Sequence, residues 1–291
     1  MQMENLYPIS LTKHVGDLMV AGETIGGWAG KGVSLPRFEY AFELISWFND
    51  HVTKLVSARL SEFKMQASAM KRTSVLGEGV KISDHVVLDT TSGPIIIDDY
   101  ANIEPFSYLI GPLYIGRHCE IKSHSRIGPS VSLGDYCKVG GEVQHSLFQN
   151  YSNKAHYGFI GHSYVGSWVN IGAGSVVSNL KSTYGTIKVQ MGEQKIDTKM
   201  QFLGTVIGDF AKLGVSSAVM GGVCIGVNAY VSGLISEHVP SFMMMTPRGN
   251  KVVDINSALM TQQRMFMRRN VSQTEADKEL LKKVFAKRGG N

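Results

Sequence analysis

The side chains best suited to chemistry lie in the stretch 153–180, NKAHYGFIGHSYVGSWVNIGAGSVVSNL. His156 carries an imidazole, which titrates near neutral pH and can take a proton from an attacking nucleophile. Asn170 and Asn179 carry carboxamides, which can form hydrogen bonds with hydroxyl groups or with a developing oxyanion. The same residues can also be structural, because asparagines form ladders along stacked strands and a histidine can lie on a surface loop without a role. The elements that position them therefore matter.

Those elements follow a six-residue repeat, which neither a helix nor a lone strand explains. The repeat predicts a triangular solenoid, in which each hexad makes one short parallel strand and one corner and three hexads close a coil. Glycines that directly follow many of the aliphatic residues tolerate the backbone angles of such corners. Aliphatic residues recur at every sixth position at Ile97, Ile103, Leu109, Ile115, Ile121, Ile127, Leu133 and Val139, and the rhythm returns at Val165 and from Ile207 to Val231.

The composition fits one or two domains with a sizeable core, since 43% of the 291 residues are hydrophobic. Three cysteines are too few for a disulfide framework and indicate a reducing compartment. Cys119 and Cys137 lie one coil apart at the small interior position, so we interpret them as core residues. No basic leader or run of about 18 apolar residues is present, which predicts a cytoplasmic protein without membrane contact.

The net charge is +5, and part of it lies in the run from Arg264 to Arg288. We interpret that run as a solvated helix face rather than a nucleic-acid site. A basic balance also suits an anionic, phosphorylated substrate.

The rhythm breaks twice, at 146–158 and at 180–204. We expect the first break to be a loop ejected from the solenoid, and the alternation in the second to form a hairpin. Loops on a regular scaffold are common places for function.

Helical patterns flank the repeat. Apolar spacing predicts an amphipathic helix over 38–64 and two helices over 255–269 and 273–287, the last with Ser272 as its N-cap. Such carboxy-terminal helices would cover the open end of the solenoid. The predicted organisation is an amino-terminal segment at 1–74, the solenoid at 75–239 and a helical cap at 240–291.

The hexads resemble the [LIV]-[GAED]-x-x-[STAV]-x pattern of hexapeptide-repeat acyltransferases, which implies an all-β solenoid with the left-handed parallel β-helix fold. The stretch 153–180 resembles the acetyltransferase half of the bifunctional N-acetylglucosamine-1-phosphate uridyltransferase/glucosamine-1-phosphate acetyltransferase family, with its lysine and histidine at Lys154 and His156 and its N-I-G-A-G at 170–174. It is closer still to a variant, sugar nucleotidyltransferase-like subfamily, which it matches at Phe159, His162 and the run 179–189.

This resemblance implies a homotrimeric, acetyl-CoA-dependent N-acetyltransferase that acts on an amino-sugar phosphate in nucleotide-sugar synthesis. It implies that His156 is the general base and that Asn170 is also catalytic. Substrate contacts are implied at Arg126, Lys154, Phe159, Asn179 and Lys188, cofactor contacts at Ala173, Gly174 and Asp209, and no metal.

Departures from the family pattern leave the acceptor open. Gln144 stands where the family has a second phosphate-binding lysine, and Phe159 replaces a tyrosine. The amino-terminal segment resembles the opening of the variant's nucleotidyltransferase half, but the chain lacks a Gly-rich phosphate loop, so we do not expect nucleotidyl transfer.

Two other functions stay open. One is a non-catalytic or regulatory trimeric homologue of a sugar-1-phosphate nucleotidyltransferase. The other is a metal enzyme of the γ-carbonic anhydrase type, which would use histidines from adjacent coils. The candidate metal ligands are His118, His124, His145, His156 and His162.

Overall fold

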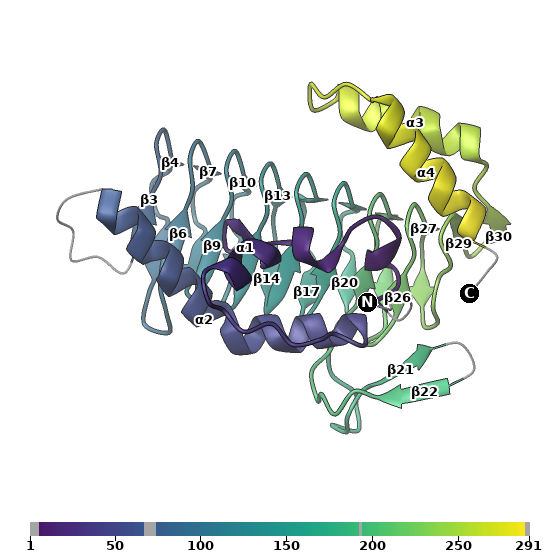
Figure 1. The fold of residues 1–291 in the computed structure, drawn as a ribbon, viewed down its shortest axis with the longest axis horizontal. Coiled ribbons are helices and arrows are strands. Elements are labelled where there is room, and N and C mark those ends of the chain that lie inside the picture. Colours follow the sequence, from purple (N-terminus) through teal and green to yellow (C-terminus); the bar gives the residue numbers. More distant parts are fainter. Residues whose placement is uncertain (1–5, 67–73, 192–193, 289–291) are drawn as a thin grey trace.

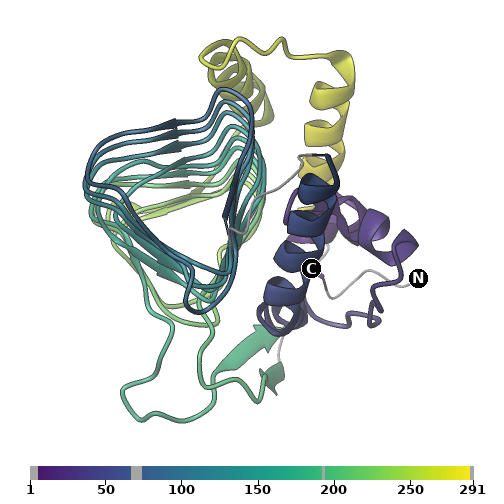
Figure 2. The ribbon, with the colours of Figure 1, turned by 90° about the vertical axis from the view of Figure 1, so that its left-hand side faces the viewer.

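The computed structural model describes residues 6–66, 74–191 and 194–288, and its centre is a triangular parallel β-solenoid (Figures 1 and 2). Three sheets form its faces. The first sheet consists of β3 (Ser74–Leu76), β6 (Ile95–Ile97), β9 (Leu113–Ile115), β12 (Val131–Leu133), β15 (Ser146–Phe148), β18 (Tyr164–Val165), β23 (Val206–Ile207) and β26 (Cys224–Ile225).

The second sheet follows the first along each coil, and the third follows the second. The second sheet consists of β4 (Lys81–Ile82), β7 (Asn102–Ile103), β10 (Glu120–Ile121), β13 (Lys138–Val139), β16 (Asn153–Lys154), β19 (Asn170–Ile171), β24 (Lys212–Leu213), β27 (Tyr230–Val231), β29 (Met243–Thr246) and β30 (Gly249–Val252). The third consists of β5 (Val87–Asp89), β8 (Tyr108–Ile110), β11 (Arg126–Ile127), β14 (Glu142–Gln144), β17 (Phe159–Gly161), β20 (Val176–Val177), β25 (Ala218–Val219) and β28 (Leu234–Ile235). We call the turns from first to second, second to third and third to first sheet the first, second and third corners.

The interior of the solenoid confirms the predicted six-residue register. Ile103, Ile121 and Val139 pair in successive coils of the second sheet, and all three are fully buried. Cys119 and Cys137 are free, buried thiols whose Sγ atoms donate to the carbonyl oxygens of Gly134 and Gln149. They fill the core, as the sequence predicts.

The hand of the coil can be followed in Figure 2, where the amino-terminal end of the solenoid faces the viewer. From the first sheet, which lies beside α2 on the right, the chain crosses the second sheet at the top and then the third sheet at the left. The coil therefore turns counterclockwise as it recedes, which is a left-handed turn. This confirms the hand implied by the resemblance and is opposite to that of most parallel crossovers.

The first break in the rhythm is not an ejected loop, so that prediction was wrong. Residues 146–158 form β15, β16 and ordinary corners of the solenoid. The coil is shorter here. A full 18-residue coil would pair Lys138 with position 156, but Lys138 pairs with Asn153. Phe148 and Lys154 occupy interior positions, which hides the aliphatic rhythm from sequence reading.

The second break is a hairpin, as predicted. Strands β21 (Lys188–Met191) and β22 (Gln194–Asp197) pair antiparallel, and an isolated bridge joins Leu180 to Phe202 at their base. The hairpin extends from the third corner towards α2 (Figure 2).

The amino-terminal segment lies along the first sheet (Figure 1). Its long helix confirms the predicted amphipathic helix, and its apolar side chains pack on β3, β6, β9 and β15. At the other end of the segment, the Tyr7 hydroxyl donates to the Val239 carbonyl oxygen at 3.4 Å. The elements are η1 (Ile9–Leu11), η2 (Val15–Asp17), β1 (Met19–Val20), β2 (Glu23–Thr24), α1 (Ile25–Gly30) and α2 (Ala41–Gln66).

The two predicted carboxy-terminal helices are present as α3 (Ile255–Met267) and α4 (Glu275–Lys287). The N-cap of α4 is Thr274 rather than the expected Ser272, because Thr274 and Asp277 form a reciprocal capping box. The helices lie beside the first corner of the later coils, where Phe266 packs against Trp168 (Figure 1). The end of the second sheet is continued instead by the β29–β30 hairpin.

Among the described residues, no helix is both long and apolar enough to cross a membrane.

Candidate functional site

The second corner changes character along the solenoid. In its first three coils the left-handed position holds His85, Phe106 and His124, whose rings stack with centroids 5.1 Å apart. Farther along, Gly158 and Gly174 take positive φ at this corner. Any side chain at Gly158 would overlap the Ser175 carbonyl oxygen. The corner surface is therefore free of stacked rings in these coils.

His156 lies at this corner, between β16 and β17, and its side chain is exposed. Its neighbour Tyr157 is 72% exposed and holds the next coil through its carbonyl oxygen, which accepts from the Gly174 N–H at 3.0 Å. Ala173 and Gly174 thus lie at the same corner, one coil from His156. Because the Gly174 N–H donates to this carbonyl oxygen, it is not free to donate to a cofactor.

Lys154 lies beneath the corner instead of on it. Its side chain occupies the interior row of Ile121 and Val139 and is only 1% exposed. Burial lowers the pKa of its ammonium group to about 8. The Nζ atom donates to the carbonyl oxygens of Gly140 at 2.6 Å and His156 at 2.9 Å.

Within one chain Lys154 is thus enclosed below the corner surface, whereas the resemblance implies a substrate contact. A buried cation is tolerated only where its protons are hydrogen-bonded, and both of these bonds go to backbone at the second corner. Lys154 holds the carbonyl of His156 in place from below rather than reaching a ligand from above.

Asn170 lies on the outer face of the second sheet, one coil after Asn153. Its side chain is exposed, and its Oδ1 accepts from Asn153 Nδ2 at 2.8 Å. The catalytic pair expected from the sequence therefore lies on neighbouring coils. His156 is at the second corner, and Asn170 is on the second sheet, shortly before that corner in the next coil.

Arg126 and Phe159 lie in one outward row of the third sheet, two coils apart, with Glu142 between them. The Arg126 guanidinium donates to Glu142 Oε1 at 3.1 Å, so its charge is partly compensated. The Phe159 ring leans over Gly161, where a side chain on the glycine would meet it.

Asn179 is farther from His156, at the third corner. Its Nδ2 lies 2.9 Å from His162 Nδ1, and His162 stacks on His145 with ring centroids 4.4 Å apart. Burial, with a smaller contribution from the neighbouring His145, lowers the pKa of His162 to about 4. Within one chain, the structure does not bring Asn179 to His156.

Two further expected residues lie away from this corner. Lys188 is exposed on the β21–β22 hairpin. Asp209 is buried at the first corner, where its carboxylate accepts from Lys13 Nζ at 2.5 Å and from the Ser167 N–H at 2.7 Å. Within one chain this carboxylate docks the amino-terminal segment onto the solenoid, whereas the resemblance implies a cofactor contact.

The histidines considered as metal ligands are spread over the three corners. His118 lies at the first, His124 and His156 at the second, and His145 and His162 at the third. In the described part of the chain, no group of three or more His, Cys, Asp or Glu residues is placed to hold a metal ion.

Sequence reasoning missed a groove of about 360 Å³ between the second sheet and α3. The groove is lined by basic, amide and aromatic side chains, with one methionine from α3. The signal that could have found it is the pair Arg268-Arg269 in the basic run of the carboxy-terminal region. The lining residues are Lys138, Tyr151, Asn153, Trp168, Val169, Asn170, Lys212, Met265, Arg268 and Arg269.

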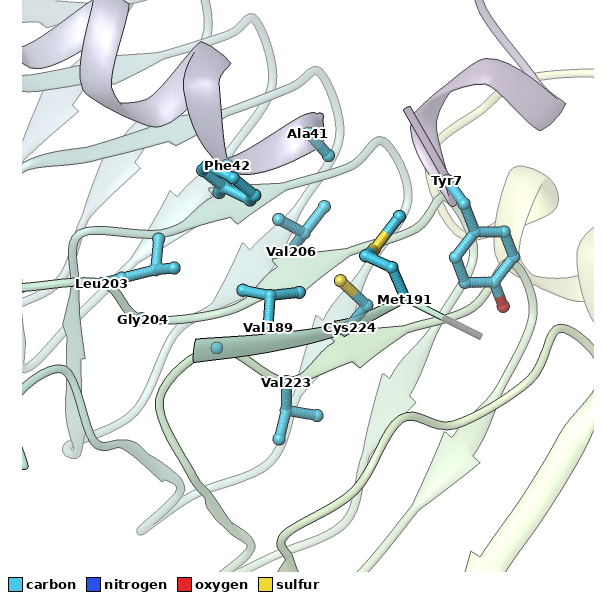
Figure 3. A pocket seen from close by; sticks show the side chains of 11 residues that line it. Tyr7, Ala41, Phe42, Val189, Met191, Leu203, Gly204, Val206, Val223 and Cys224 are labelled. Carbon is cyan, nitrogen blue, oxygen red and sulfur yellow. The ribbon is translucent and has the colours of Figure 1, made fainter. Parts of the chain in front are cut away.

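A second cavity is far smaller, at about 10 Å³, and lies where the amino-terminal segment, the hairpin and the first sheet meet (Figure 3). Apolar side chains such as Phe42, Val189 and Val206 surround it. Its volume is about that needed for one water molecule, so it is a packing defect and not a substrate site.

No family model matches the chain. The bifunctional sugar-1-phosphate nucleotidylyltransferase/acetyltransferase of Sulfurisphaera tokodaii is 32% identical over 141 residues, covering 48% of this chain and 35% of that protein. The bifunctional protein GlmU of Alkaliphilus metalliredigens is 27% identical over 180 residues, covering 61% of this chain and 31% of that protein. The chain thus spans about a third of the length of these relatives, and they confirm the resemblance stated from the sequence.

The solved structures that match the chain include the UDP-N-acetylglucosamine acyltransferase of Francisella novicida, with a TM-score of 0.43 and 17% identity over 74% of this chain and 78% of that chain. The N-acyltransferase AntD of Bacillus cereus, in complex with dTDP and 3-hydroxybutyryl-CoA, has a TM-score of 0.32 and 13% identity over 73% of this chain and 96% of that chain.

Proposed function

We propose that the chain is an acetyl-CoA-dependent N-acetyltransferase whose acceptor is an amino-sugar phosphate. The observation that carries the proposal is the exposed His156 at a corner cleared of stacked rings, one coil from Asn170, Ala173 and Gly174. The sugar-1-phosphate nucleotidylyltransferase/acetyltransferase relatives support the choice of reaction.

The proposed chemistry is attack of the acceptor amine on the thioester carbonyl of acetyl-CoA. A C–N bond forms as the C–S bond breaks, and the amine must lose a proton to leave a neutral amide. His156 takes that proton and can return it to the leaving thiolate of CoA. In this proposal the Asn170 carboxamide orients the acceptor or donates to the oxyanion of the tetrahedral intermediate.

The proposal includes a homotrimer with sites between neighbouring solenoids. Asn179 and Lys188 lie away from His156 within one chain, so a single chain offers only one wall of the site. A neighbouring subunit that presents its third corner would bring Asn179 to the second corner of the first subunit. A fully active monomer in light scattering combined with an activity assay would contradict this arrangement.

Two observations favour a second candidate, a non-catalytic or regulatory homologue. Arg126, the expected phosphate contact, is paired with Glu142, and Gln144 stands where the family has a lysine. Both features weaken recognition of a glucosamine-1-phosphate-like acceptor.

Acetyl transfer distinguishes the two candidates. The purified protein is incubated with acetyl-CoA and a panel of hexosamine phosphates and nucleotide-linked amino sugars, and release of free thiol is followed. We expect acceptor-dependent release with at least one amino sugar and none with the corresponding N-acetylated sugar. Release at the acceptor-free rate throughout the panel would favour the non-catalytic homologue.

A further inference from the structure

The groove between the second sheet and α3 has the composition of an anion site. Four of its ten lining side chains are basic: Lys138, Lys212, Arg268 and Arg269. Within the described residues, no carboxylate lines it. The four basic side chains give the lining of the groove a positive charge, which favours an anionic ligand.

The basic groups of the groove are only partly compensated by the protein. Lys138 pairs with Glu120 at 2.6 Å, and Arg269 Nη1 donates to the Tyr136 carbonyl oxygen at 3.3 Å. Arg268 is exposed, and its guanidinium has no partner among the described residues. At least one planar guanidinium is therefore available for two-pronged binding of an oxyanion.

Lys212 is the most enclosed of these cations. Its Nζ donates to the Phe210 carbonyl oxygen at 2.5 Å and lies 4.6 Å from the centre of the Tyr230 ring. Burial lowers the pKa of its ammonium group to about 7, so at neutral pH the charge is held at a cost. An anion in the groove would stabilise the protonated form.

Aromatic side chains pack α3, one wall of the groove, against the solenoid. Trp168 stacks on Tyr151 below it at 4.2 Å and against Phe266 of α3 at 4.4 Å. Since both faces of the Trp168 ring are covered, it presents only its edge to a ligand. The backbone of Arg268, one residue beyond α3, therefore lies beside the second sheet, where its guanidinium lines the groove.

The groove is also close to the candidate site. Asn170 belongs to both, and Asn153 lies three residues before His156. That separation spans at most about 10 Å of chain. A ligand that reached from the groove to the second corner would therefore need only the length of a sugar or a short phosphate linkage.

From these observations we propose that the groove binds the phosphate or diphosphate group of a ligand, through Arg268, Lys138 and Lys212, with Asn153 and Asn170 as neutral partners. The phosphate can come from the acceptor or from CoA. That choice rests on the proposed acetyl transfer, whereas phosphate binding itself does not.

Binding of simple phosphate probes, measured calorimetrically without an acetyl donor, tests the site. The wild-type full chain is titrated with inorganic pyrophosphate, UDP, CoA and dephospho-CoA. The variant is Arg268→Gln, and the control is Arg264→Gln, an exposed arginine of the same helix that does not line the groove. We expect Arg268→Gln to weaken pyrophosphate binding roughly tenfold or more, and Arg264→Gln to leave it unchanged.

The same titrations identify the source of the phosphate. A tenfold loss for UDP alone would support a nucleotide-linked acceptor, and a loss for CoA but not for dephospho-CoA would support the 3′-phosphate of CoA. A loss for pyrophosphate without thiol release from any acceptor would leave the site standing and reject the acetyl transfer. No binding of any probe to the wild type, or equal affinities in both variants, would overturn the site.

Discussion

The first and second corners of the solenoid share one backbone conformation but use it differently. At the first corner Tyr100, His118, Tyr136, Tyr151 and Trp168 take positive φ in successive coils, and their rings stack with centroids 4.2–5.1 Å apart. At the second corner the stack ends at His124, and Gly141, Gly158, Gly174 and Ser216 take positive φ in the next four coils.

The difference separates a corner used for stability from a corner used for access. A left-handed backbone costs a non-glycine residue about 1–2 kcal/mol, and a stacked aromatic pair returns about 0.5–1.5 kcal/mol beyond its buried area. Rings at the first corner thus offset the strain and lock the coils together. Glycine avoids the strain but offers no ring to a stack, so beside His156 the exposed Tyr157 ring lies over the Gly174 corner instead.

The largest expected difference between the two corners is the effect of replacing His156 on the rate of acetyl transfer. If the glycine corner is the site of proton transfer, His156→Ala lowers kcat by about 10²–10⁴, because the amine loses its general base. The control is His124→Ala at the same corner, whose ring stacks on Phe106, and its kcat should stay within a few-fold of wild type. Rates of acetyl transfer by thiol release decide between them, and a rate in His156→Ala close to that of His124→Ala would reject the assignment.

Removing a ring from the first corner should affect stability instead. Trp168→Ala deletes the link between Tyr151 and Phe266 and should lower the free energy of unfolding by about 3 kcal/mol. Tyr184→Ala, which removes a 69% exposed ring, should change it by no more than about 0.5 kcal/mol. Urea unfolding measures both, and equal midpoints would show that the stack does not stabilise the coils.

At the third corner the stacked ring of His162 is itself titratable, so stacking there should make the free energy of unfolding depend on pH. The pKa of folded His162 is lowered from 6.5 to about 4, so between these values the unfolded chain binds the proton more readily. The folded state therefore keeps the full contribution of neutral His162 to its free energy of unfolding above pH 6.5. It loses that contribution as the pH falls towards 4. We expect a loss of about 2 kcal/mol from this group.

His162→Phe keeps a ring beside Phe202 and should flatten that dependence. Unfolding free energies measured from pH 7 to pH 4 provide the test. An unchanged slope in the variant would place the titration elsewhere.

The smallest expected effect comes from adding a methyl group to Gly174 at the second corner. Gly174→Ala adds a Cβ 3.1 Å from Ser216 Oγ and 3.2 Å from the Tyr157 hydroxyl, at φ +75°. It should cost about 1 kcal/mol of stability and lower acetyl transfer several-fold. Gly233→Ala has a similar φ of +88° at the same corner farther along, so it should lose stability but not activity. Equal activity in the two variants would contradict a role for the Gly174 corner.

Much of the fold follows from local pattern, because a six-residue period sets strand, corner and interior together. The amphipathic helix and the hairpin also follow from local patterns, the helix from its helical apolar spacing and the hairpin from alternation. The short coil around 146–158 does not, since Phe148 and Lys154 take interior positions normally held by aliphatic residues. A break in rhythm then looks the same whether the chain leaves the solenoid or tightens within it.

The candidate site was predictable only where a motif fixes it in register. The motif names His156 and Asn170 as candidates, and the structure has them on adjoining coils of the solenoid. The burial of Asp209 depends on Lys13, which is 196 positions away along the chain. The basic groove depends on α3 packing against the second sheet. Such long-range contacts leave no period in the sequence.

The amino-terminal segment changes how a solenoid can come apart. A stack of repeats behaves as a one-dimensional lattice, in which the ends fray and unfolding spreads from neighbour to neighbour. Here Tyr7 is bonded to Val239 near the last coils, while α2 packs on β3 in the first. The amino-terminal segment therefore contacts both ends of the solenoid. Unfolding of the coils at either end must also detach this segment from the other coils. The molecule should lose its structure in a single cooperative step, as a closed fold does.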